Sequence, residues 1–329
     1  NRKGVNLIVE TFTMVSPLIA LLATATGSNQ QGLINWLRDD SIDCYINPAI
    51  AIRQSRCGSG YGCFVTKNVE EDELLISIPT SSCLSIADAL LDDDCGEKFG
   101  EILKKAGPGG GLVGMAGYIA KEYLKMEHLG EKYEGRWGAY LKTLPFREGM
   151  NEQDHMLWWR NNEVETLLKG SYAFDDAMGI RNEVDVAVKI LSGVIGPSVK
   201  RTRQGFLPFG GNTEGVDEAI RGAFVSIMSR AFDGLLDDEE LRLVPLLDML
   251  QHSDEPNIRH ATKNGQVDIH ARSAIIAGSE LMNTYNEQLP SWKYFTRFGF
   301  VPGKNDVSVR ELLQAKDPIF FEARATAEV

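Results

Sequence analysis

The segment from Pro245 to Pro302 constrains the fold of this 329-residue chain more than any other part. Two strand-like stretches, Ile258–Lys263 and Gln266–Ala271, are separated only by Asn264–Gly265. Both positions of a type I′ turn require positive φ, and Asn-Gly is the strongest short signal for such a turn. The segment therefore predicts a tight β-hairpin.

Distinctive side chains lie on both sides of this hairpin. An apolar run leads into the polar triplet Gln251–His252–Ser253 before it. After it, the turn Ala277–Gly278 introduces a strand predicted over Glu280–Tyr285, and Phe298-Gly299-Phe300 follows. Strand ends and the loops beside them are common places for functional side chains. Composition alone does not produce this order of polar turn, hairpin, tyrosine and aromatic triplet.

The composition narrows the function classes. Lys and Arg number 34 against 46 Asp and Glu, so the net charge of −12 argues against a nucleic-acid ligand and favours a basic or neutral protein segment as partner. The five cysteines form no CxxC pair, which predicts free thiols and neither a zinc cluster nor a disulfide framework. His252, His260 and His270 match no common metal-ligand spacing, so no metal is expected.

The first hundred residues have strand character. Strands are predicted over Tyr45–Ile52, Cys63–Thr66 and Glu73–Ile78, and Ser85 can cap a helix that begins at Ile86. Upstream, a short helix is predicted over residues 32–37. The apolar run over residues 14–25 has the features of a targeting segment, although it is too short for a comfortable membrane span. We expect residues before Gln31 to lie outside the fold.

The middle of the chain is helical. Apolar residues recur at helical spacing over Met115–Leu129, Asp154–Leu168 and Asn182–Ile195, between glycine-rich loops at Gly107–Gly111 and Gly205–Gly215. One more helix is predicted over residues 216–232. A helical block is thus inserted into a frame of strands.

Five short motifs occur in an order that resembles SET-domain protein methyltransferases. They are Gly60-Tyr61-Gly62, Ser229-Arg230-Ala231-Phe232, the turn Asp248–Ser253, Tyr285 after its strand, and Phe298-Gly299-Phe300. The split arrangement resembles in particular the Rubisco large-subunit lysine methyltransferase type, over about Gly32 to Gly303. The resemblance implies the α+β class: a β-rich SET fold of small sheets with a pseudoknot, interrupted by an α-helical insert.

The resemblance also implies domain limits. Residues 31–100 and 229–303 correspond to the two parts of the SET domain, and residues 101–228 to the helical insert. Residues 1–30 are an N-terminal extension and a candidate targeting segment. Residues 304–329 begin a C-terminal region that is truncated relative to the family. The insert has weaker matches to the family at Trp159, at Glu163 and over residues 167–171.

S-adenosylmethionine is the cofactor that the resemblance implies. The residues expected to bind it are Ser59, Gly60, Tyr61, Arg230, Gln251, His252, Tyr285 and Phe298. The planar guanidinium of Arg230 suits the cofactor carboxylate. Gln251 replaces the asparagine of the family, which keeps the amide and adds a methylene and a rotor. Tyr285 is the expected catalytic residue.

Ordinary structural roles remain possible for several of these residues. Gly60–Gly62 can be an ordinary turn, Arg230 a solvated helix charge, His252 a satisfied structural histidine, and Phe298, which lacks a hydroxyl that some relatives have, simple core packing. A helix stripe that faces the core explains the apolar residues of the insert equally well.

The sequence predicts a monomeric protein-lysine methyltransferase that acts on a non-histone protein. Two other functions stay open: methylation of a histidine, and a catalytically silent SET fold that binds protein. The compartment is a plastid or the cytoplasm and nucleus, with the plastid favoured if residues 14–25 are a targeting segment.

Overall fold

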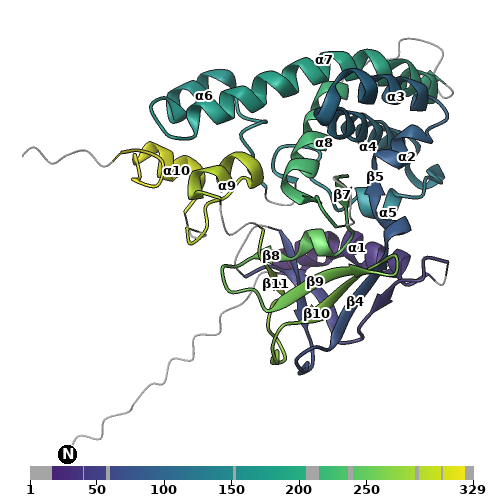
Figure 1. The fold of residues 1–329 in the computed structure, drawn as a ribbon, viewed down its shortest axis with the longest axis vertical. Helices are drawn as coiled ribbons and strands as arrows, with labels where there is room; N and C mark the ends of the chain where they lie inside the picture. The colour runs from purple at the N-terminus through teal and green to yellow at the C-terminus, as the bar shows by residue number, and fades with distance from the viewer. Residues whose placement is uncertain are drawn as a thin grey trace, which may run out of the picture.

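The computed structural model describes residues 17–39, 41–56, 60–150, 153–204, 215–235, 240–285, 289–304 and 307–322. Small sheets form one end of the molecule, and a block of helices forms the other (Figure 1). The last two helices, drawn in yellow, lie beside the long helix block and above the sheets (Figure 1). This is an α+β architecture of small sheets interrupted by a helical segment, as the sequence predicts.

Short strands form four sheets in the described part of the chain. The strands are β1 (Tyr45–Ile46), β2 (Ile50–Gln54), β3 (Tyr61–Val65), β4 (Leu74–Pro79), β5 (Leu84–Ser85), β6 (Ala231–Phe232), β7 (Arg242–Leu243), β8 (Gln251–His252), β9 (Ile258–Lys263), β10 (Gln266–Ala271) and β11 (Met282–Asn283). The sheet orders are β1-β4-β10-β9, β11-β8, β2-β3 and β5-β7-β6. Segments from the first and the last third of the sequence therefore share a sheet, since β10 pairs with β4.

The predicted hairpin is confirmed. β9 and β10 pair antiparallel, with Gln266 opposite Lys263. Asn264 and Gly265 have φ of 53° and 75°, the left-handed values that the turn requires. Alternate residues of β10 are buried, among them Val267 and Ile269, so one face of the hairpin belongs to the core.

Two strand predictions were too long. The stretch Tyr45–Ile52 divides into β1 and β2 because Asn47 starts a turn, in which its Oδ1 accepts from the N–H of Ala49 at 2.9 Å. The stretch Glu280–Tyr285 pairs as a strand only over β11. There the Asn257 side chain takes the place of a strand partner, with 2.8 Å hydrogen bonds to the Glu280 carbonyl and the Met282 N–H.

Ten α-helices lie in the described part of the chain. They are α1 (Pro17–Leu37), α2 (Ile86–Leu90), α3 (Gly96–Lys105), α4 (Gly110–Leu129), α5 (Gly138–Leu141), α6 (Asn161–Leu168), α7 (Phe174–Gln204), α8 (Val216–Arg230), α9 (Ser291–Phe298) and α10 (Val309–Gln314). Ser85 caps α2 as predicted, in a capping box with Asp88. No helix in the described ranges has the length and apolar character needed to cross a membrane.

Several helix limits differ from the predictions. The helix predicted over residues 32–37 is the end of α1, which begins at Pro17 and buries Gln30. The helix predicted from Asp154 begins only at Asn161, since Asp154 accepts a hydrogen bond from the Trp159 indole and holds the chain in a loop. The helix predicted to reach residue 232 ends at residue 230, where β6 begins.

The glycine-rich stretches also behave differently from the predictions. Gly107–Gly111 is a 3₁₀ turn that runs into α4, because Pro108 suits the first turn of a helix. Residues 205–214 of the second stretch lie outside the described residues. Within the helix block, the Phe146 carbonyl lies where a side chain at Gly222 would project, 2.2 Å from the position of a Cβ. Glycine is thus required where α8 meets the chain that follows α5.

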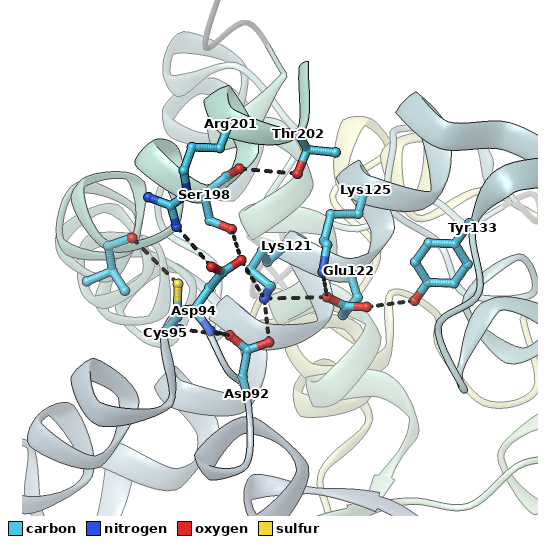
Figure 2. A network of polar contacts seen from close by, with 11 residues as sticks. Asp92, Asp94, Cys95, Lys121, Glu122, Lys125, Tyr133, Ser198, Arg201 and Thr202 are labelled. Atoms are coloured by element: carbon cyan, nitrogen blue, oxygen red, sulfur yellow. Dashed lines mark hydrogen bonds and ion pairs between the residues drawn. The ribbon is translucent and has the colours of Figure 1, made fainter. Parts of the chain in front are cut away.

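A cluster of charged side chains ties the helix block together (Figure 2). Lys121 of α4 has an exposed side-chain fraction of 1%, and its ammonium contacts Asp92, with Glu122 at 3.5 Å and Asp94 at 3.9 Å. Asp94 in turn accepts from Ser198 and Arg201 of α7 at 2.6 and 3.0 Å. The Lys121 cluster, as we call these residues, therefore joins the loop before α3 to α4 and α7.

The thiols agree with the prediction where they are described. Cys44, Cys63, Cys83 and Cys95 are free. Cys57 lies outside the described residues.

Candidate active site

A cavity of about 810 Å³ lies where the sheets, α8, α9 and the start of α10 meet. Its wall includes five residues that the sequence predicts as site residues: Arg230, Gln251, His252, Tyr285 and Phe298. These residues are separated by up to 68 positions in the sequence, and the fold brings them to one cavity. A volume of this size is ordinary for a site that holds a small molecule.

The other three predicted residues stand in a different position. Gly60 has a φ of 77°, which suits a turn before β3, and neither Gly60 nor Tyr61 lines the cavity. The Tyr61 carbonyl accepts a hydrogen bond from the Gln251 side-chain amide at 3.1 Å. Gln251 therefore joins the Gly-Tyr-Gly strand to the cavity wall. Ser59 lies outside the described residues.

Tyr285 is fixed by two hydrogen bonds. It follows β11, which pairs parallel with β8 so that Asn283 lies opposite His252. Its backbone N–H donates to His252 Nδ1 at 3.2 Å, and its hydroxyl donates to the Leu250 carbonyl at 2.9 Å. The hydroxyl oxygen is thereby held in the wall of the cavity.

The imidazole ring of His252 holds the backbone of Tyr285 in place. Its Nε2 lies 3.3 Å from Asp254 Oδ1 while Nδ1 accepts from Tyr285. Burial lowers the pKa of His252, and the Asp254 carboxylate only partly opposes this. A neutral imidazole with an acceptor at Nδ1 is the form that the Tyr285 N–H requires. The sequence left open a structural histidine or a cofactor contact, and this geometry supports a positioning role.

Aromatic rings surround Tyr285. The rings of Phe298 and His252 have centroids 5.0 and 5.3 Å from its own, and Phe300 lies at 6.0 Å. Between the two phenylalanines, Gly299 has a φ of 84°, and a Cβ there would lie 2.8 Å from the Asp154 carbonyl. Phe298 therefore both packs and lines the cavity, so the simple core-packing alternative describes only part of its surroundings.

A charged pair, Arg230 and Asp248, also lines the cavity. Arg230, the last residue of α8, donates from Nη1 to the Asp248 carbonyl at 3.2 Å, and the same nitrogen lies 3.7 Å from Asp248 Oδ2. The Tyr140 hydroxyl of α5 donates to that Oδ2 at 2.8 Å. Burial raises the pKa of Asp248 to about 6, and the Arg230 charge opposes this effect. Asp248 thus connects the helical insert to Arg230.

Two polar atoms of this pair have no hydrogen-bond partner in the described part of the chain. They are Arg230 Nε and Asp248 Oδ1, and both atoms are buried. Buried polar groups are normally hydrogen-bonded, so exceptions call for an explanation such as a bound group. Because both residues line the cavity, a ligand with polar atoms fits this wall.

The backbone just before Asp248 is strained. Leu246 has a φ of 70° and a ψ of −42°, values that a branched side chain rarely adopts. Its side chain is fully buried, and this packing holds the unfavourable conformation in place. The strain falls at the turn that places Asp248 and Gln251.

Sequence reasoning missed the residues at the far end of the cavity. Asp154 lines it and forms a two-pronged ion pair with Arg310 of α10, at 2.8 and 3.2 Å. Arg310 also contacts Glu163 and stacks over Trp159 at 4.3 Å. The matches at Trp159 and Glu163 thus serve to anchor α10. Pairing of Asp154 with a residue 156 positions later has no local sequence signal.

Among the described residues, no group of three or more His, Cys, Asp or Glu side chains is arranged to hold a metal ion. The chemistry available in the cavity is that of donors, acceptors and aromatic faces.

Comparison with known proteins gives a consistent result. The SET domain profile matches residues 60–286. Mouse N-lysine methyltransferase SETD6 is 23% identical over 289 residues, which cover 83% of this chain and 54% of that protein. Ribosomal lysine N-methyltransferase 4 of Saccharomyces cerevisiae is 25% identical over 297 residues, with 82% and 55% covered. The chain spans about half the length of these relatives.

Solved structures show the same fold. Rubisco LSMT bound to AdoMet superimposes with a TM-score of 0.62 and 18% identity, over 84% of this chain and 57% of that one. The SET domain of LSMT bound to lysine and AdoHcy gives a TM-score of 0.62 at 17% identity, with the same coverage.

Proposed function

The chain belongs to the SET-domain family, and we propose that it transfers methyl groups from S-adenosylmethionine to a lysine side chain of a protein other than a histone. The single observation that carries this proposal is the convergence of Arg230, Gln251, His252, Tyr285 and Phe298 on one cavity. Relatives named as N-lysine methyltransferases support the lysine. The names of the yeast relative and of the structural neighbours, ribosomal and Rubisco, support a non-histone substrate.

The residues of the cavity fit the cofactor. Arg230 Nε is a buried donor without a partner in the described ranges, and a guanidinium suits a carboxylate. The rings of Phe298 and Phe300 offer faces for a flat heterocycle. When bound, S-adenosylmethionine supplies an electrophilic methyl group on a sulfonium. Arg230, Gln251 and the aromatic wall would hold it.

Tyr285 has the role closest to the reaction. The Tyr285 hydroxyl donates a hydrogen bond to the Leu250 carbonyl, and a lone pair of its oxygen can accept a hydrogen bond from an incoming amine. A lysine amine has an ordinary pKa of about 10.4, so the site must favour its neutral form. The surrounding aromatic rings exclude water and so disfavour the charged ammonium. Positioning of a neutral amine is the main task in such a transfer.

Incubation with labelled S-adenosylmethionine and a cell lysate tests the activity. We expect label on a lysine side chain, located by mass spectrometry of the modified protein. Label on a histidine would replace lysine as the target. Cofactor binding without any labelled product would contradict the proposed enzymatic activity and favour a protein-binding SET fold.

Tyr285→Phe tests the role of the hydroxyl. Turnover should fall about 100-fold or more, while cofactor affinity by calorimetry stays unchanged, because the ring remains in the aromatic wall. Tyr172→Phe is the matched control, since Tyr172 lies on the insert with 46% of its surface exposed. Full turnover by the Tyr285 variant would remove that residue from its role.

A further inference from the structure

A second cavity lies in the helical insert. It has a volume of about 350 Å³ and shares no lining residue with the candidate active site. Its wall comes from the loop before α6, the start of α6, the long helix α7 and the first two turns of α8. None of the described residues expected to bind the cofactor lines it.

The inner wall contains a buried arginine. Arg181 of α7 has an exposed fraction of 7%, and it donates to the Met156 carbonyl and to Asn161 Oδ1, the latter at 2.6 Å. Both acceptors are neutral. Within the described ranges no carboxylate lies within 4.0 Å of this guanidinium. A buried charge without a close counter-ion is costly unless a ligand supplies one.

A second arginine reinforces the charge. Arg221 of α8 lines the same cavity and pairs with Asp185 at 2.5 Å. Burial lowers the pKa of Arg181, and the Arg221 charge acts in the same direction, with Asp185 opposing both. The two guanidiniums therefore repel each other in a partly desolvated place. The side chain of Arg221 is 27% exposed, so the cavity is open to solvent on this side.

An indole completes the set of donors. Trp158 Nε1 is buried and has no hydrogen-bond partner in the part of the chain that the structure describes. The carboxylates in the wall are at its exposed edge: Glu218 is exposed, and Glu148 lies 3.6 Å from Arg310. The residues that line the inner wall thus carry N–H donors and positive charge.

From these contacts we propose that the cavity between α6, α7 and α8 binds a single oxyanion, a phosphate or carboxylate group, through Arg181, Arg221 and the Trp158 indole. A planar guanidinium and an indole N–H are suited to oxygen acceptors that carry negative charge. A cation or an apolar group would leave these donors without partners.

Thermal unfolding in different salts tests the site. Sodium phosphate and sodium acetate are compared with sodium chloride at matched ionic strength. A ligand that binds only the folded protein raises the Tm, and we expect a rise of about 2 °C or more over chloride. A rise with phosphate alone identifies a phosphate group, and an equal rise with acetate identifies a carboxylate. No rise with either anion overturns the site.

Variants locate the effect. Trp158→Phe keeps an aromatic ring and removes the N–H, and Arg221→Gln removes the accessible charge. Both should lose the anion-dependent rise in Tm, each measured against its own chloride reference. Arg201→Gln is the matched control, because Arg201 lies on α7, is 61% exposed and pairs with Asp94. An equal rise in all four proteins would show general salt stabilisation and contradict the site.

Discussion

The Lys121 cluster of the helical insert and the Arg230–Asp248 pair at the cavity both bury charged groups, yet they differ in how completely their atoms are bonded. Lys121 contacts three carboxylates, and none of the four side chains has a buried polar atom without a partner (Figure 2). Arg230 and Asp248 each keep one such atom.

The difference separates a structural ion cluster from a site. Burial lowers the pKa of Lys121, but the hydrogen bond and charge of Asp92 outweigh it, so the pKa is raised and the ammonium stays charged. Burial instead raises the pKa of Asp248 to about 6, despite Arg230. A cluster complete within the chain serves stability. A pair left incomplete costs stability and can be completed by a ligand.

The largest expected effect is on the structural side of this comparison. Lys121→Met should lower the free energy of unfolding by about 3–5 kcal/mol, because it leaves the Asp92 carboxylate buried without its counter-ion. Urea denaturation measures this loss. Lys125→Met is the control: Lys125 lies one turn further along α4, is 27% exposed, and should lose less than about 1 kcal/mol. Equal losses in the two variants would contradict the structural role of the cluster.

The next effect is on the pH dependence of stability, which should have opposite signs for Asp248 at the cavity and Asp94 in the Lys121 cluster. The pKa of Asp248 is about 6 in the folded protein against 3.8 ordinarily, so the folded state binds more protons between these values. Protonated Asp248 therefore stabilises the folded protein below pH 3.8, and this stabilisation is lost as the pH rises through about 6. The stability of the wild type relative to Asp248→Asn should therefore fall by about 3 kcal/mol between pH 4 and 7.

Asp94 is the matched control in the Lys121 cluster. The hydrogen bond from Ser198 lowers the pKa of Asp94. Ionised Asp94 therefore stabilises the folded protein above pH 3.8, and this stabilisation is lost as the pH falls. The stability of the wild type relative to Asp94→Asn should thus rise with pH. Chemical denaturation of the three proteins across this range gives both slopes. Slopes of the same sign would break the comparison.

The sequence predicted the parts of the fold that depend on local chemistry. The β9–β10 hairpin followed from Asn264–Gly265, and the start of α2 from Ser85. Limits were missed where side chains from distant segments decide them. The Asn257 amide shortens the strand before Tyr285, and Asp154 delays α6 by its bond to Trp159.

The same division applies to the candidate site. Residues within recognisable motifs, such as Arg230 and Tyr285, could be found from their order in the chain. The pairing of Tyr140 with Asp248 spans 108 positions, and no periodicity or spacing indicates it. The Leu246 strain is likewise a property of the folded turn. Roles that depend on tertiary contacts became visible only in the structure.

The most direct test of the cofactor site is a calorimetric titration of S-adenosylmethionine into the wild type and Arg230→Lys. The variant keeps the positive charge beside Asp248 and removes the Nε donor. We predict one binding site in the wild type and an affinity about 10- to 100-fold weaker in the variant, since a hydrogen bond to a charged group is lost. No binding heat in the wild type, or equal affinities, would contradict this placement of the cofactor.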